Sequence, residues 1–210
     1  MLLKNDQTHG EKCPEQDDPR LKRVQGGLTQ IGIESDIQCL PNKVSPFVSR
    51  NQDMFDVLRL LSQDSNNIVQ IFGMPGLGKS SLLKNVTCHL GERDVYKDGV
   101  LYIDFLHVST FKESVQILNA YLKDIEEDQF YESFNQDEFQ REIERLKSKV
   151  SRFNKKFLFS LDNIDHLVKE NHEQFLTLLT EIASSSVKIL FTSNKFSCKD
   201  FASGFSVKKI

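Results

Sequence analysis

Hydrophobic residues recur at helical spacing most clearly between residues 139 and 153. Phe139, Ile143, Leu146, Val150 and Phe153 follow one another at intervals of four, three, four and three residues. That spacing places the apolar side chains on one face of a helix whose remaining positions are polar. The pattern predicts an amphipathic helix over this stretch.

Shorter hydrophobic runs predict strands along the rest of the chain. The runs at 68–72, 99–106, 157–161 and 187–191 are almost uninterrupted, which is typical of strands buried on both faces of a sheet. A further run begins at 205–207. Strands that alternate with helical patterns imply βαβ units. The sequence therefore predicts an α/β fold with a mostly parallel sheet of about five strands and helices on both faces.

A helical pattern follows the first of these strands directly. Leu82, Val86 and Leu90 share one helix face, and Gly91 is placed to end the helix. Residues 1–45 differ from this regular alternation, because charges, glycines and prolines are scattered there without sustained periodicity. We expect residues 1–45 to be a flexible leader or linker, and residues 46–210 to form one domain.

The composition is that of an ordinary globular protein. The 210 residues include 27 Lys and Arg against 30 Asp and Glu, a net charge of -3. No basic excess is present to neutralise phosphates, which argues against nucleic acid as the main partner. No apolar run approaches the ~18 residues of a membrane span, and the N-terminus turns charged at once, unlike a signal peptide. The four cysteines are widely spaced along the sequence. We interpret them as free thiols in a reducing compartment. We expect a cytoplasmic protein without a membrane partner.

The strongest chemical signal is the loop after the first strand. Residues 73–80 read GMPGLGKS, an unbroken G-x-x-x-x-G-K-[ST] phosphate-loop motif. Its glycines let backbone N–H groups turn towards phosphate oxygens, and the following helix adds its positive N-terminal end. Lys79 supplies a point charge for the β- and γ-phosphates, and the Ser80 hydroxyl is a magnesium ligand. The residues expected to contact the nucleotide phosphates are Gly73, Gly76, Leu77, Gly78, Lys79, Ser80 and Ser81.

A phosphate loop also needs a carboxylate for its hydrated magnesium ion, at the C-terminal end of a neighbouring strand. The strand at 157–161 runs directly into Asp162. We therefore assign Asp162, together with Ser80, as a magnesium ligand. Asp165 lies three residues farther on and is interpreted as a helix cap.

With these motifs in place, the chain resembles the NB-ARC branch of the STAND class of P-loop ATPases over about residues 46–208. Residues 47–53 (FVSRNQD) look like the family's F-V-G-R-E-x-E segment. Residues 157–165 (FLFSLDNID) resemble its magnesium-binding strand, L-L-V-L-D-D-V. Residues 188–194 (KILFTSN) resemble its next strand, which ends T-T-R.

The resemblance implies binding of ATP or ADP with Mg²⁺ by a regulatory switch domain. It places Val48 and Arg50 beside the adenine. It also implies that the strand at 187–191 lies between the phosphate-loop strand and the strand that carries Asp162. The family acts through protein partners or self-association, which here are expected to involve segments outside this chain.

Two departures from the family pattern concern catalysis. Asn163 stands where the family has a second acid that orients or deprotonates the attacking water, and an amide cannot take a proton. Asn194 stands where an arginine senses the γ-phosphate. The sequence also stops at Ile210, before the helical and winged-helix modules of the family. Asp162, Asn163 and Asn194 are the candidate catalytic residues, and we expect very slow or no hydrolysis by the isolated chain.

Two other functions stay open at this point. Residues 194–197 (NKFS) resemble the N-K-x-D guanine motif of small GTPases, although Ser197 replaces the base-reading aspartate. Alternatively, the fold serves as a scaffold or oligomerisation module without nucleotide. Nucleotide titration discriminates the scaffold from a nucleotide-binding protein, because a scaffold shows no magnesium-dependent stabilisation by nucleotide.

Overall fold

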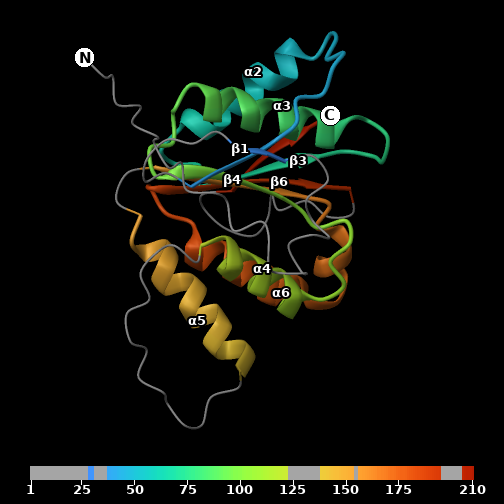
Figure 1. Ribbon diagram of the computed structural model, residues 1–210. Coiled ribbons are helices and arrows are strands. Elements are labelled where there is room, and N and C mark those ends of the chain that lie inside the picture. Colours follow the sequence, from blue (N-terminus) through green and yellow to red (C-terminus); the bar gives the residue numbers. More distant parts are fainter. Residues whose placement is uncertain (1–27, 31–36, 123–137, 154–155, 195–204) are drawn as a thin grey trace, which may run out of the picture.

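The computed structural model describes residues 28–30, 37–122, 138–153, 156–194 and 205–210 (Figure 1). Its strands are β1 (Leu28–Gln30), β2 (Ile37–Pro41), β3 (Ile68–Phe72), β4 (Gly99–Asp104), β5 (Phe157–Asp162), β6 (Val187–Ser193) and β7 (Phe205–Lys209). Its helices are α2 (Asn51–Ser62), α3 (Lys79–Glu92), α4 (Phe111–Tyr121), α5 (Glu138–Ser151) and α6 (Asp165–Ile182).

The strands of the described chain form one sheet, in the order β1-β2-β4-β5-β6-β3-β7. β1 pairs antiparallel with β2, and all the other neighbouring strands are parallel. β6 lies between β5 and β3, with Ile189 opposite both Phe159 and Ile68. The α/β fold and the expected position of β6 are confirmed. Every residue of β5 and β6 is buried, which explains their almost uninterrupted hydrophobic runs.

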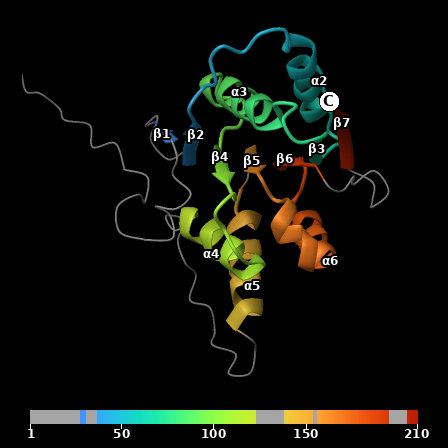
Figure 2. The same ribbon diagram turned by 90° about the vertical axis from the view of Figure 1, so that its right-hand side faces the viewer.

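Helices cover both faces of the sheet. In Figure 2, α2 and α3 lie on one face, and α4, α5 and α6 lie on the other. Successive residues of a strand point to opposite faces, so each central strand contributes to two hydrophobic cores. Leu158 packs in the core beneath α2 and α3, whereas Phe159 packs in the core beneath α4, α5 and α6. The sheet is thereby packed against helices on both faces.

The amphipathic helix predicted from residue 139 is α5. Leu146 and Val150 are buried on its apolar face, and α5 packs against α4 and α6. Phe153 lies just beyond the helix and stacks on Phe157 of β5, with ring centroids 4.1 Å apart and planes inclined by 6°. Such aromatic pairs contribute about 0.5–1.5 kcal/mol beyond the area they bury. The helical spacing therefore identified the side of α5 that docks.

The leader predicted for residues 1–45 requires a correction, because β1 and β2 lie within it. β2 pairs parallel with β4, with Ile37 opposite Gly99, and Cys39 and Leu40 are buried in the two cores. A strand of five residues is too short to show a period by itself, so its neighbour in the sheet determines its structure. The domain begins before residue 46, while residues 1–27 and 31–36 lie outside the described chain.

The helix end predicted at Gly91 also differs, since α3 continues to Glu92. Gly91 is buried inside the last turn of the helix. A Cβ atom at this position would lie 2.6 Å from Cδ2 of Leu40. The glycine therefore allows α3 to approach β2 closely.

Among the helices of the described ranges, none combines the length and the apolar character needed to cross a membrane.

Candidate functional site

The phosphate-loop motif connects the C-terminal end of β3 to the first residue of α3. Gly76 and Gly78 adopt positive φ angles of 84° and 74°. Residues with a Cβ rarely adopt this left-handed conformation, so glycines are required at both positions. Gly78 directly precedes Lys79, where α3 begins. The backbone N–H groups at the start of α3 thus lie where the sequence predicts an anion site.

Lys79 is buried and points back into the loop. Its Nζ donates hydrogen bonds to the carbonyl oxygens of Gly73 and Met74, both at 2.9 Å. Burial lowers the pKa of Lys79, while the charges of Asp165 and Asp162 oppose that effect. A phosphate in the loop gives this ammonium anionic partners in place of neutral carbonyls.

Ser80 and Asp162 are brought together although they lie 82 residues apart in the sequence. The Ser80 hydroxyl donates to Oδ1 of Asp162 at 3.0 Å. Asp162 is fully buried at the end of β5 and also accepts hydrogen bonds from the hydroxyls of Thr192 and Tyr102. Burial raises the pKa of the Asp162 carboxyl, and the hydrogen bond from Thr192 lowers it.

This pair fits a magnesium ion. Mg²⁺ prefers oxygen ligands at about 2.0–2.1 Å and is commonly held by one or two protein groups together with phosphates and water. A hydroxyl and a carboxylate oxygen 3.0 Å apart can occupy adjacent positions around one such ion. The unusual burial of the Asp162 carboxylate is also consistent with a cationic partner.

Asn163 follows Asp162 in a left-handed backbone conformation, with φ at 57°. Its backbone N–H donates to Oδ1 of Asp162 and to Oγ1 of Thr192. Its side-chain amide donates to Oδ1 of Asp104 at 2.8 Å. Asp104 was not among the site residues predicted from the sequence. A signal was present, because the hydrophobic run at 99–103 ends in an acid as the run at 157–161 does.

The cap interpretation of Asp165 is wrong. Asp165 is the first residue of α6, and its carboxylate accepts hydrogen bonds from the Ser193 hydroxyl and from the backbone N–H of Asn194. It thus ties the start of α6 to the end of β6. Asn194 lies at this same carboxyl edge of the sheet, half-buried, and its role at the γ-phosphate stays a prediction.

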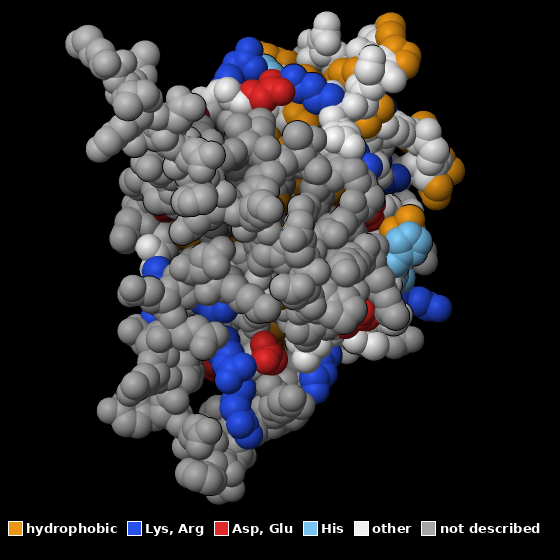
Figure 3. All heavy atoms as spheres, in the orientation of Figure 1, with side chains coloured by type: hydrophobic (Ala, Val, Ile, Leu, Met, Phe, Trp, Pro, Cys, Tyr) orange, Lys and Arg blue, Asp and Glu red, His pale blue; other side chains and the backbone are white. Residues whose placement is uncertain are grey.

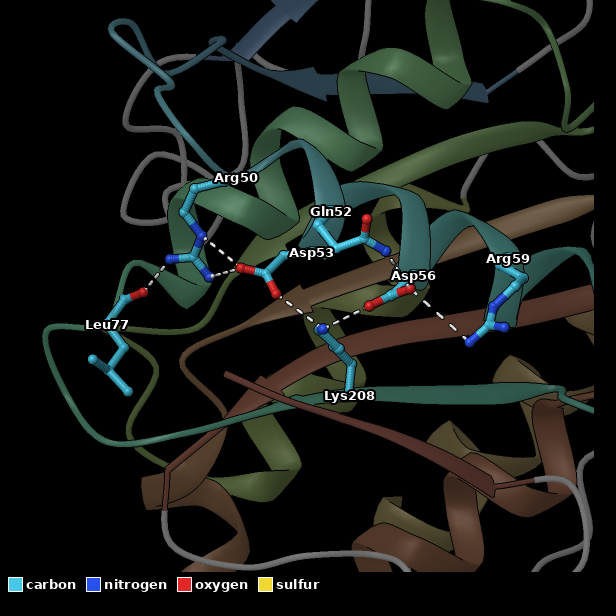
Figure 4. Close-up of polar contacts among 7 residues, drawn as sticks. All are labelled: Arg50, Gln52, Asp53, Asp56, Arg59, Leu77 and Lys208. Atoms are coloured by element: carbon cyan, nitrogen blue, oxygen red, sulfur yellow. Dashed lines mark hydrogen bonds and ion pairs between the residues drawn. The ribbon is translucent and has the colours of Figure 1, made fainter.

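Arg50 reaches the phosphate loop from the residue before α2. Its Nη1 donates to the carbonyl oxygen of Leu77, and its Nε donates to Asp53 at 3.0 Å (Figure 4). Lys208 of β7 forms ion pairs with Asp53 at 2.9 Å and with Asp56 at 2.8 Å. The charge network therefore connects the loop through α2 to the last strand. Arg50 and Leu77 come together as predicted site residues, but an adenine contact stays a prediction.

The end of β7 also touches the loop. The backbone N–H of Ile210 donates to the carbonyl oxygen of Phe72 at 2.9 Å. A Cβ atom at Gly73 would lie 2.6 Å from the carbonyl oxygen of Ile210. Gly73 is therefore required by a close backbone approach, in addition to any contact with phosphate.

Exposed hydrophobic side chains occur within the loop and shortly before α2. Val48, Met74 and Leu77 are 70%, 73% and 44% exposed. Figure 3 shows hydrophobic side chains at the upper right of the molecule, while described acids and bases are mixed over the face in view.

Ser81 lies in the first turn of α3. The guanine-type motif from Lys195 onward lies outside the described residues.

A family model described as an ATPase domain predominantly from Archaea matches residues 47–190 of the chain. The match begins beside Val48 and ends within β6, so it spans the phosphate loop, Asp104 and Asp162.

Curated relatives include the chaperone protein ClpB of Mycoplasma genitalium, 24% identical over 141 residues, which are 67% of this chain and 17% of that protein. ClpB of Lactococcus lactis is 28% identical over 68 residues, 32% of this chain and 8% of that protein. The chain thus spans less than a fifth of the length of these relatives.

Similar solved structures include the Orc1 protein of Aeropyrum pernix in complex with DNA. Its TM-score is 0.55 at 20% identity, covering 74% of this chain and 41% of that one. A STAND protein with a tetratricopeptide-repeat sensor from Pyrococcus horikoshii has a TM-score of 0.54 at 15% identity, covering 86% of this chain and 25% of that one. At these identities, the likeness shows the P-loop ATPase fold.

Proposed function

The chain belongs to this family of ATPase domains found predominantly in Archaea, and from that premise we propose that it is an ATP- and ADP-binding switch of the STAND type. The observation that carries the proposal is the Ser80–Asp162 pair, 3.0 Å apart beside the buried Lys79. These three groups come from α3 and β5 and meet at the carboxyl edge of the sheet. The order of the weaker NB-ARC-like motifs supports the STAND branch.

Each residue has a defined part in nucleotide binding. The loop N–H groups and Lys79 bind the phosphates, and Ser80 and Asp162 hold Mg²⁺. The ion, when bound, neutralises charge on the β- and γ-phosphates. The resemblance to NB-ARC domains supports a role for Val48 and Arg50 beside the base.

Turnover is proposed to be very slow in the isolated chain. Asn163 cannot accept a proton from water, and Asn194 brings no positive charge to the transition state. Nucleotide occupancy then persists long enough to serve as a signal for protein partners or for self-association. The cytoplasmic location and the expectation of no nucleic-acid or membrane partner stay predictions.

Isothermal titration calorimetry with ATP and Mg²⁺ tests the proposal. Lys79→Ala should weaken binding by about 10- to 100-fold, because a charge-assisted contact is worth about 1.5–3 kcal/mol. Lys43→Ala is the matched control, since Lys43 is exposed and pairs with Glu92 at the far end of α3. Equal affinity of wild type and Lys79→Ala would refute the site.

Two further titrations separate the alternatives. Tighter binding of GTP than of ATP would favour the GTPase function. No magnesium-dependent binding of either nucleotide would favour the scaffold function. A single-turnover hydrolysis rate at or above ~1 s⁻¹ would contradict slow turnover.

A further inference from the structure

Two neighbouring strands end in carboxylates at the same level of the sheet. Asp104 of β4 lies directly opposite Asp162 of β5 in the parallel register. Only Asp162 contacts Ser80, so the two acids have different surroundings. Asp162 is fully buried, whereas Asp104 is half-buried at the edge where parallel strands gather their ligands.

Asp104 is held in place by two donors. Its Oδ1 accepts a hydrogen bond from the Asn163 amide at 2.8 Å and from the backbone N–H of Leu106 at 3.0 Å. The left-handed backbone of Asn163 turns this amide towards β4. A carboxylate is therefore fixed beside the very residue whose amide cannot accept a proton.

We propose that Asp104 is the carboxylate that orients the attacking water for ATP hydrolysis, with Asn163 holding it in position. The proposal rests on the nucleotide-binding function above. An oriented water needs an acceptor for one of its hydrogens, and a carboxylate oxygen is a stronger acceptor than an amide oxygen. Asp104 lies one strand farther from the phosphate loop than Asn163. That longer reach is consistent with slow turnover.

The reaction step balances without any further reagent. The water oxygen forms a bond to the γ-phosphorus while it donates a hydrogen bond to Asp104. The bond between the γ-phosphorus and the oxygen that bridges to the β-phosphate breaks, and its electron pair stays on ADP. The proton lost by the water passes to the inorganic phosphate. The products are ADP and phosphate.

The test compares Asp104→Asn with Asp98→Asn. Asp98 is the matched control, because it is half-buried and directly precedes Gly99, at the opposite, amino-terminal end of β4. Two affinities are measured by calorimetry with Mg²⁺: that for a non-hydrolysable ATP analogue, and that for ADP with aluminium fluoride, which mimics the transferring phosphoryl group with its in-line water. The second readout reports on the transition state even when turnover is too slow to measure.

Asp104→Asn should keep the affinity for the ATP analogue within about twofold and lose about tenfold or more in affinity for the aluminium fluoride complex. Single-turnover hydrolysis should fall by about 10²-fold. Asp98→Asn should change neither quantity. Unchanged affinity of Asp104→Asn for the aluminium fluoride complex would overturn the role of Asp104. If the wild type does not bind the ATP analogue, the proposed function is overturned instead.

Two more variants separate this role from a structural one. Asn163→Gly tolerates the positive φ and removes only the amide that holds Asp104, so it should give a smaller loss of aluminium fluoride affinity. The double variant Asp104→Asn/Asn163→Asp exchanges the two groups and should regain aluminium fluoride affinity relative to Asp104→Asn. If neither variant shows the expected change in aluminium fluoride affinity, the proposed pairing of Asn163 with Asp104 is refuted.

Discussion

Gly91→Ala tests whether β2 belongs to the folded domain. Alanine is favoured over glycine inside a helix by about 0.5–1 kcal/mol. If residues 37–41 were a flexible leader, α3 would have open space beside Gly91, and the substitution would stabilise the protein. The structure predicts the opposite sign.

The magnitude follows from the contact between α3 and β2. A Cβ atom at Gly91 would lie 2.6 and 2.8 Å from the two methyl groups of Leu40, and 3.3 Å from its Cγ. Leu40 is 2% exposed, so its methyl groups cannot move into solvent. Overpacking of this kind costs about 1–3 kcal/mol, which exceeds the gain in helix propensity. We expect a net loss of about 1 kcal/mol and a Tm lower by about 2–4 °C.

The assay is thermal and urea unfolding of wild type and variant at one pH, followed by circular dichroism. Leu40→Ala provides the control background, because it removes the methyl groups that collide with the new Cβ. Gly91→Ala should stabilise the protein in that background, so its effect on stability has the opposite sign from its effect in the wild-type background. The double-mutant cycle then reports a coupling energy between Gly91 and Leu40. A higher Tm for Gly91→Ala in the wild-type background would refute the reasoning.

Two predictions concern titratable groups. Because burial lowers the pKa of Lys79 in the free protein and bound phosphates favour its charged form, ATP affinity should fall as the pH rises through that lowered pKa. Calorimetry in alkaline buffers of different ionisation enthalpy should show that the protein takes up a proton when ATP binds. Absence of this proton uptake would contradict a buried Lys79. Burial also raises the pKa of Cys88 to about 11, so this thiol should resist iodoacetamide at pH 8 in the native protein and react after unfolding in urea. Equal labelling of Cys88 in both states, measured by mass spectrometry, would contradict its burial.

The central sheet was accessible from the sequence because its strands are buried on both faces. The runs that became β3, β5 and β6 are hydrophobic almost throughout, so they stand out without knowledge of their neighbours. β2 was missed because its structure depends on pairing with β4, far away in the sequence. Local pattern does not contain that information.

The candidate site likewise contains residues that the local sequence predicts and contacts that only the sheet pairing determines. Lys79 and Ser80 belong to a contiguous motif, and Asp162 follows from its place after a buried strand. The link between Asn163 and Asp104 depends on which strand lies beside β5 and in which register. Asp165 was misread because an aspartate at a helix start is usually a cap, whereas here its carboxylate binds Ser193 and Asn194 at the end of β6, which local pattern does not reveal.

The position of β3 in the sheet has a consequence for how the protein acquires its site during synthesis. Ile68 of β3 pairs with Ile189 on one side and with Phe205 on the other, so both neighbours of this strand come late in the chain. Loop closure over such separations slows folding. The phosphate loop is synthesised before β6 and β7, which are the two strands that flank β3 in the described sheet. Under the proposed function, ATP would find a formed site only after β6 and β7 have been synthesised, and its binding would then stabilise the state in which both strands are paired with β3.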